Sequence, residues 1–261
     1  QLDTLNAQVL SVGAINGLAT QDRFPSVDIR NFGINDINSL DPKETIIIVG
    51  KGPNLDDFIK NYNLYKKFDK LALNNAVLTK EIKFKYYFQQ DFSKNVVNNS
   101  NYSKHVVSVL DKHKIPNYNQ AFNYTLTNNI IPIIPKVYHA DFKTRLYWNT
   151  IPKLIENNKK TKFINIIFSD KKIFKIEHDK LTIPKYPYHP PSVTTTALIY
   201  SVSKNYKNIL FAGVTDYNDS NIKKQYKDYF KLFKQYFPKV QIYGLYPTSN
   251  DMFEHNININ N

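Results

Sequence analysis

The sequence of 261 residues contains no cysteine. Disulfide bonds and thiolate metal ligands are therefore excluded, and cysteine usage says nothing about the redox compartment. Glycine and arginine are also scarce, with 7 glycines and only three arginines, Arg23, Arg30 and Arg145. Hydrophobic residues nevertheless make up 42% of the chain and aromatic residues 14%, so the sequence predicts a folded core rather than a disordered chain.

Long apolar runs are missing as well. No stretch approaches the roughly 20 consecutive apolar residues that a membrane-spanning helix needs. We therefore predict a cytoplasmic protein, and we leave open a peripheral association with the inner face of a membrane. Nothing in the sequence indicates the oligomeric state.

The charge is strongly unbalanced, with a formal net charge of +13 that comes almost entirely from lysine. A positive charge of this size favours acidic partners such as phosphorylated ligands. Readout of base edges and bidentate binding of phosphate rely on arginine, which is nearly absent. We therefore expect no nucleic-acid partner and interpret most of the lysines as a solvated basic surface.

The hydrophobic pattern divides the chain into two regions. Residues 1–44 begin with apolar residues at helical spacing and continue as a polar stretch, which predicts an N-terminal helix and a linker. Residues 45–261 alternate between strand and helix patterns without an internal repeat. This alternation predicts one α/β domain built on a doubly wound, mostly parallel, Rossmann-like sheet.

The elements of the second region follow from β-branched runs and from helical spacing. Strands are expected at residues 45–49, 71–73, 84–88, 105–110, 130–134, 163–168, 208–212 and 241–244, the last of these being the final strand. Helices are expected at residues 54–67, 193–204 and 221–237, with Asn54 capping the first of them. A proline-rich connector is expected near residues 184–191.

A glycine pair follows the first predicted strand, in the sequence Gly50-Lys-Gly-Pro-Asn-Leu55. Glycines at the carboxyl end of a parallel strand let the backbone approach a phosphate or a ribose, and a following helix supplies unpaired N–H groups. The full dinucleotide fingerprint and the Walker motif are absent. The residues alone therefore indicate either a ligand site or a simple connecting turn.

Five segments resemble, in the same order, motifs of the bacterial lipooligosaccharide sialyltransferases and of the related sialyltransferase-like motility-associated proteins. The segments are residues 50–55, which resemble the Gly-x-Gly-Pro-Ser-Leu motif, and residues 73–75, 87–90, 206–217 and 240–249. The resemblance implies a glycosyltransferase that transfers a sialic-acid-type or related ulosonic acid sugar. The donor would be a CMP-activated sugar and the acceptor a glycan hydroxyl, with inversion at the anomeric carbon and without a metal or other cofactor.

The same segments and their neighbours imply the residues that bind the donor. Residues 50–54 would face the nucleotide phosphate, residues 213–215 the ribose and base, and Tyr217 would hydrogen-bond the departing phosphate. The predicted donor-binding residues are Gly50, Gly52, Pro53, Asn54, Asn74, Asn75, Gln90, Asp91, Ser192, Thr194, Gly213 and Thr215.

The sequence also departs from the family pattern. Thr215 stands where the family has an aspartate, and Asp216 follows one position later. The family's lid insertion, which carries its catalytic histidine, has no counterpart after Tyr217. An arginine of the family's proline-ordered loop is missing too, so the identity of the general base is open.

Histidine is the first residue type to consider as the general base, because its pKa lies near the operating pH. His189, in the stiff and proline-ordered loop at residues 186–192, is the first candidate. His255 and His139 follow it. Asp216 and Asp91 are the alternatives if a carboxylate serves instead.

Two other functions remain open from the sequence. One is a magnesium-dependent, nucleotide-using enzyme similar to the pterin pyrophosphokinases, which would share the glycine turn. The other is a non-catalytic module that binds a nucleotide or a glycan, which the missing histidine and arginine would favour. No histidine and carboxylate cluster with metal-ligand spacing is visible in the sequence, so we predict no metal site.

Overall fold

The computed structural model describes residues 34–52, 54–89, 118–139, 153–169, 171–178, 180–184, 193–214, 220–245 and 255–257. The helices are α3 (Ile34–Ser39), α4 (Leu55–Lys60), α5 (Tyr62–Tyr65), the 3-10 helix η2 (Asn74–Leu78), α8 (Tyr118–Thr127), α9 (Lys153–Glu156), α10 (Val193–Ser203) and α11 (Ser220–Tyr236). The strands are β1 (Thr45–Val49), β2 (Asp69–Leu73), β3 (Tyr86–Phe88), β4 (Ile131–His139), β5 (Lys162–Ser169), β6 (Lys175–Glu177), β7 (Lys180–Pro184), β8 (Asn208–Ala212), β9 (Gln241–Leu245) and β10 (His255–Ile257).

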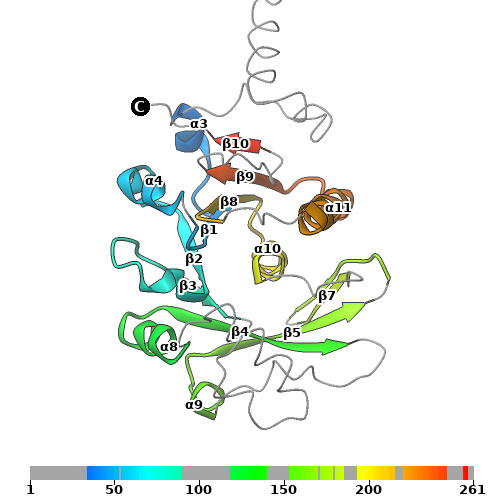
Figure 1. Cartoon of the computed structure of the whole chain (residues 1–261), viewed down its shortest axis with the longest axis horizontal. Coiled ribbons are helices and arrows are strands. Elements are labelled where there is room, and N and C mark those ends of the chain that lie inside the picture. The colour runs from blue at the N-terminus through cyan, green and yellow to red at the C-terminus, as the bar shows by residue number, and fades with distance from the viewer. Residues whose placement is uncertain are drawn as a thin grey trace, which may run out of the picture.

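These strands form one ten-stranded sheet in the order β10-β9-β8-β1-β2-β3-β4-β5-β7-β6. Neighbouring strands are parallel throughout, except for the antiparallel pair of β6 and β7. The fold is therefore α/β with a mostly parallel sheet, as the alternating pattern predicts. Figure 1 shows the sheet curving around α10, with α4 and α8 on its other face.

Strand β1 lies in the middle of the sheet, between β2 and β8. Its side chains Ile46, Ile47 and Ile48 are all fully buried. β-Branched residues favour the extended backbone, and a continuous apolar run is typical of a parallel strand that is covered on both faces. Residues 45–49 thus form the buried parallel strand that their pattern predicts.

Two hydrophobic clusters cover the two faces of the sheet. One cluster includes Phe211 of β8, Leu198 of α10 and Phe233 of α11. The other includes Phe58 of α4 and Phe122 of α8. Because each face of a sheet must be buried against another layer, helices on both faces give the three layers of this α/β domain.

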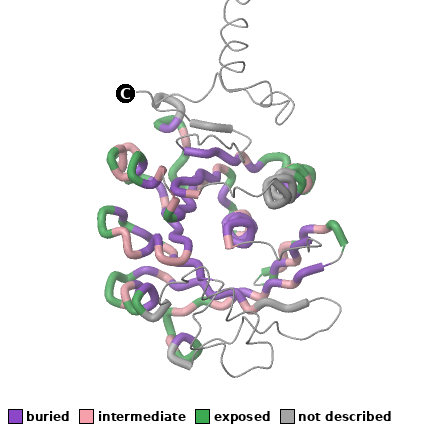
Figure 2. Tube along the Cα trace, in the orientation of Figure 1, coloured by how far each residue is buried: buried purple, intermediate pink, exposed green. Residues whose placement is uncertain are grey.

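Helix α10 is the most deeply buried helix of the described part. All eight residues from Thr194 to Ser201 are buried, and the tube of α10 in Figure 2 is almost entirely in the colour of buried residues. Because α10 buries hydroxyl side chains along with its apolar ones, these polar groups need partners within the protein. The hydroxyl of Ser201 is compatible with this position because it donates to the carbonyl of Ala197 at 2.9 Å.

Several predicted elements are confirmed within one or two residues. The helix expected at residues 193–204 is α10, and the helix expected at residues 221–237 is α11. The strand expected at residues 208–212 is β8 with the same bounds. The predicted strand at residues 105–110 and the predicted helix near the start of the chain lie outside the described residues.

Other predictions are wrong in detail. The single helix expected at residues 54–67 is divided into α4 and α5 at Asn61, whose backbone N–H and side-chain amide both bond to the carbonyl of Asp57. The predicted linker contains α3, and Ile37 packs it into the core with 1% exposure. The strand at residues 241–245 is not the final one, because β10 follows it.

β6, β7 and α8 were not predicted, because these elements are short or weakly periodic. Pro132 and Pro135 both lie inside β4, opposite Tyr87 and Ile164. A proline removes one donor and fixes one dihedral angle, so the longer parallel ladder tolerates both. Within the described residues, no helix has the length and apolar character to cross a membrane.

Candidate functional site

The strand order of the sheet reverses direction at β1. From β1 the chain adds β2, β3, β4, β5 and β7 on one side, and it then returns through α10 to place β8 on the other side. In open α/β sheets, ligands bind beyond the carboxyl ends of the strands at such a switch point. The carboxyl ends of β1 and β8 therefore mark the candidate site.

Gly50 and Gly213 follow these two strands and pack against each other. The N–H of Gly50 donates to the carbonyl of Ala212 at 2.8 Å. A Cβ atom on Gly50 would lie 2.4 Å from the carbonyl oxygen of Gly213, and a Cβ atom on Gly213 would lie 2.4 Å from the carbonyl oxygen of Gly50. Glycine is thus required at both positions because the two backbones are in contact. The sequence indicated either a close approach to a ligand or a simple connecting turn.

Gly213 also needs its own backbone conformation. Its φ angle is +62°, in the left-handed region that side chains other than those of Asn and Asp rarely adopt. The bond from the N–H of Gly52 to the carbonyl of Gly213, at 2.6 Å, then fixes the turn after β1 to the turn after β8. The turn at residues 50–52 presents the exposed side chain of Lys51.

Asn54 stands at the N-cap position of α4, as predicted. Its side chain, however, makes no capping hydrogen bond. Instead, its Nδ2 atom donates to the carbonyl of Leu245 at the carboxyl end of β9, at 3.1 Å. Asn54 therefore ties the helix after β1 to a strand that is two positions away in the sheet.

Asn74 and Asn75 follow the carboxyl end of β2, directly beside β1. Asn74 has a φ angle of +49°, a conformation that asparagine tolerates better than most residues. Its Oδ1 atom is buried and has no hydrogen-bond partner within the described part of the chain. Buried acceptors are normally satisfied, so this atom indicates an unfilled donor position at the candidate site.

The carboxyl end of β3 carries a polar residue that the sequence reading did not select. Gln89 is 4% exposed, and its Oε1 atom accepts a hydrogen bond of 2.8 Å from the hydroxyl of Tyr87. Burial raises the pKa of Tyr87, which keeps this hydroxyl protonated as a donor. The period of two in a strand places Tyr87 and Gln89 on one face, so strand alternation could have indicated Gln89 before its neighbour Gln90.

Helix α10 begins at the same edge of the sheet. It returns the chain from β7 to β8, so it runs antiparallel to the strands and its N-terminus lies at their carboxyl ends. Thr194 stands in its first turn, with 8% of its surface exposed. The N-terminus of a helix carries unpaired N–H groups and a partial positive charge, which favours an anionic ligand.

The remaining predicted site residues lie outside the described residues. These are Pro53, Gln90, Asp91, His189, Ser192, Thr215, Asp216 and Tyr217, and their roles stay predictions. Of the other histidines that we considered, His139 ends β4 and His255 begins β10. The structure thus brings together Gly50, Gly52, Asn54, Asn74, Asn75, Thr194 and Gly213 at one edge of the sheet.

Among the described residues, no group of three or more histidine and carboxylate side chains could hold a metal ion. The prediction of metal-independent chemistry stays untested, because several of the predicted polar residues lie in other segments.

Comparison of the chain with models of known protein families, with curated proteins and with solved structures found no match in any of the three. The resemblance in five sequence segments therefore stays a prediction.

Proposed function

We propose that the protein is a glycosyltransferase that binds a CMP-activated, sialic-acid-type or related ulosonic acid sugar at the carboxyl ends of β1, β2 and β8. The observation that carries the proposal is the paired glycine turn of Gly50 and Gly213 at the point where the strand order reverses. This is the position at which Rossmann-like sheets hold nucleotides. The ordered sequence segments that suggest the sugar donor include the turns after β1, β2 and β8, which supports the proposal.

The described residues supply groups suited to a nucleotide. The exposed ammonium of Lys51 in the turn after β1 and the N-terminus of α10 would offset the negative charge of the phosphate. The buried Oδ1 atom of Asn74 would accept a hydrogen bond from an N–H or O–H group of the donor. Such a site orients the donor without requiring a metal ion to neutralise the leaving group.

The transfer breaks the bond between the anomeric carbon and the phosphate oxygen, and it forms a bond from that carbon to the acceptor oxygen. CMP leaves with the bonding electron pair, and the general base takes the proton of the acceptor hydroxyl. We assign the base to His189 and the hydrogen bond on the departing phosphate to Tyr217. Asp216 is the alternative base.

A thermal-shift panel of nucleotides tests the donor class, because a ligand that binds the native state raises the melting temperature. We expect CMP and CDP to stabilise the protein and AMP and GMP to have no effect at the same concentration. The CMP shift should persist in EDTA. A shift that appears only with ATP and magnesium would instead support a pyrophosphokinase-like enzyme.

The matched variant for this experiment is Gly52→Val. A branched side chain in the turn at residues 50–52 should obstruct the ligand, so the variant should lose the shift with CMP while it keeps a cooperative melting transition. Lys239→Gln, on the exposed turn before β9, serves as the control and should keep the full shift. An unchanged CMP affinity in Gly52→Val would remove this turn from the site.

A further inference from the structure

The edge of the sheet opposite the candidate site is formed by the segments that lead into four adjacent strands, β8, β1, β2 and β3. These segments are residues 40–44, 66–69, 79–85 and 204–207. Direct bonds hold them together: the N–H of Asn208 donates to the carbonyl of Glu44 at 2.9 Å, and the N–H of Lys85 donates to the carbonyl of Lys70 at 3.0 Å. Because parallel strands all start at one edge, these segments form a single surface, which we call the basic edge.

The basic edge is rich in exposed lysine. Its eight lysines are Lys43, Lys66, Lys67, Lys80, Lys83, Lys85, Lys204 and Lys207, and all of them are exposed. Its carboxylates are half as many, namely Asp41, Glu44, Asp69 and Glu81. The surface therefore carries a clear excess of positive charge.

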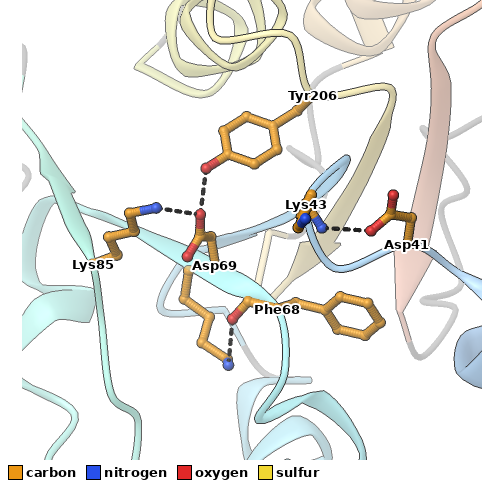
Figure 3. Close-up of polar contacts among 7 residues, drawn as sticks. Asp41, Lys43, Phe68, Asp69, Lys85 and Tyr206 are labelled. Carbon is orange, nitrogen blue, oxygen red and sulfur yellow. Dashed lines mark hydrogen bonds and ion pairs between the residues drawn. The ribbon is translucent and has the colours of Figure 1, made fainter.

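Two of these carboxylates are already bound within the protein. Asp69 accepts a hydrogen bond of 2.5 Å from the hydroxyl of Tyr206 and forms an ion pair of 2.6 Å with Lys85 (Figure 3). Glu44 forms an ion pair with Lys207. These contacts satisfy the acidic groups locally, so the carboxylates add little attraction for a cationic partner.

Of the other six lysines of the basic edge, Lys67 donates to the carbonyl of Asn38 at 2.9 Å. Lys43, Lys66, Lys80, Lys83 and Lys204 form no ion pair within the described part of the chain. Five ammonium groups on one edge of the sheet repel one another, and this repulsion raises the electrostatic energy of the protein. That repulsion is relieved when an anionic surface approaches.

We propose that the basic edge docks onto an anionic phospholipid surface. Lysine is a compact, hydrated point charge, which suits delocalised attraction to headgroups, and each lysine near such a surface contributes a similar increment of binding. Binding of single-stranded nucleic acid relies on exposed aromatic side chains for stacking. The aromatic residues of these segments, Phe68, Phe84 and Tyr206, are only 4%, 5% and 6% exposed, so the lipid surface is the partner that fits.

The docked orientation has a geometric consequence. The basic edge lies at the amino ends of β1, β2 and β8, and the candidate site lies at the carboxyl ends of the same strands. A protein held through the basic edge therefore directs the candidate site away from the bilayer. This inference does not depend on the identity of the ligand that the site binds.

Vesicle sedimentation of the full chain tests the proposal. We expect binding to vesicles with about 30% phosphatidylserine or phosphatidylglycerol, little binding to pure phosphatidylcholine, and loss of binding at high salt. The variant Lys43→Gln/Lys66→Gln/Lys83→Gln removes three unpaired ammonium groups and should weaken vesicle binding by at least about thirtyfold.

The control Lys171→Gln/Lys172→Gln/Lys231→Gln removes the same charge from exposed positions outside the basic edge, two of them after the carboxyl end of β5. It should keep most of the binding, and the melting temperatures of both variants should match that of the parent. Equal losses in the two variants, no binding by the parent, or tighter binding to an oligonucleotide than to vesicles would each overturn the proposal.

Discussion

The two edges of the sheet satisfy their polar groups in different ways. At the amino ends of the strands, Asp69 is bound by both Tyr206 and Lys85, and Glu44 is bound by Lys207. At the carboxyl ends, Gly50 and Gly213 bring two backbones into contact, while the Oδ1 atom of Asn74 is buried without a hydrogen-bond partner in the described residues. Two carboxylates of the amino edge are thus satisfied within the chain, whereas the carboxyl edge retains a buried acceptor for a ligand.

This difference separates the origins of stability and of function. Internal ion pairs and hydrogen bonds at the amino edge hold four strands in register, so substitutions there should change folding more than ligand binding. A buried acceptor without a partner disfavours folding, and this cost is recovered only when a ligand donates to it. Four substitutions test this division, and their expected effects decrease in the order given below.

His189→Ala should produce the largest change, a decrease in kcat of about 10² to 10⁴ at nearly constant donor affinity, if this residue is the general base. The kcat of the parent should fall at low pH with an apparent pKa near that of histidine, and the variant should lose this dependence. His178→Asn, at an exposed turn with a φ angle of +36°, is the control and should keep full activity. Retention of more than about half of kcat in His189→Ala would move the assignment to Asp216.

Gly213→Ala should destabilise the native state by about 2–4 kcal/mol, which combines left-handed strain with overpacking. The new Cβ atom would meet the carbonyl oxygen of Gly50 at 2.4 Å. Urea unfolding measures the change. Asn205→Gly, at another left-handed position with a φ angle of +66°, should cost less than about 0.5 kcal/mol. Equal effects would show that the contact between Gly50 and Gly213 is not tight.

Lys70→Met tests whether a buried lysine at the amino edge makes the free energy of unfolding depend on pH. Burial lowers the pKa of Lys70 from 10.5 to about 8, and its ammonium donates to the carbonyls of Phe68 and Lys66 at 2.7 and 3.1 Å. Between pH 8 and 10.5 the unfolded chain holds this proton and the native state does not, so the free energy of unfolding rises with pH.

The rise contributed by Lys70 should reach about 3 kcal/mol at most, because one pKa unit corresponds to about 1.4 kcal/mol. Chemical unfolding at a series of pH values should show this increase for the parent relative to Lys70→Met. Lys67→Met, on the exposed turn before β2, is the control and should follow the parent. Parallel curves for the parent and Lys70→Met would contradict the lowered pKa.

Asn74→Gly should have the smallest effect on folding, within about 0.5 kcal/mol. Glycine accepts the φ angle of +49°, and the lost Oδ1 atom has no partner to leave behind in the described structure. The affinity for CMP should nevertheless fall about tenfold, as expected for the loss of one hydrogen bond. Isothermal titration calorimetry measures the affinity, and an unchanged value would place Asn74 outside the ligand contact.

Much of the fold could be predicted because its central elements have patterns that only one structure satisfies. Three elements have patterns that are long or uniform enough to predict them directly. They are β1 with its run of isoleucines, the buried helix α10 and the amphipathic helix α11. The antiparallel β6 is three residues long, and α4 ends after six residues, so their stability depends on tertiary contacts that no local pattern reveals.

The site was predicted less completely. Gly50 and Gly213 lie together at the carboxyl edge, but the contact that requires both glycines spans 163 positions of sequence, which local reasoning cannot show. Asn54 was assigned a cap because of its place before a helix, whereas its Nδ2 atom donates to the carbonyl of Leu245 and its oxygen makes no capping bond. Gln89 was missed because the choice between it and Gln90 depends on which face of β3 is buried.

The position of β8 beside β1 also determines when the sheet can be completed. Thr45 pairs with Asn208, which lies 163 residues later in the chain. Contacts between such distant segments are closed slowly, since the entropy of a long loop must be lost before the pairing stabilises it. During synthesis, one side of β1 therefore stays unpaired until residue 212 has emerged from the ribosome, and this apolar strand edge is the segment that most needs protection against aggregation.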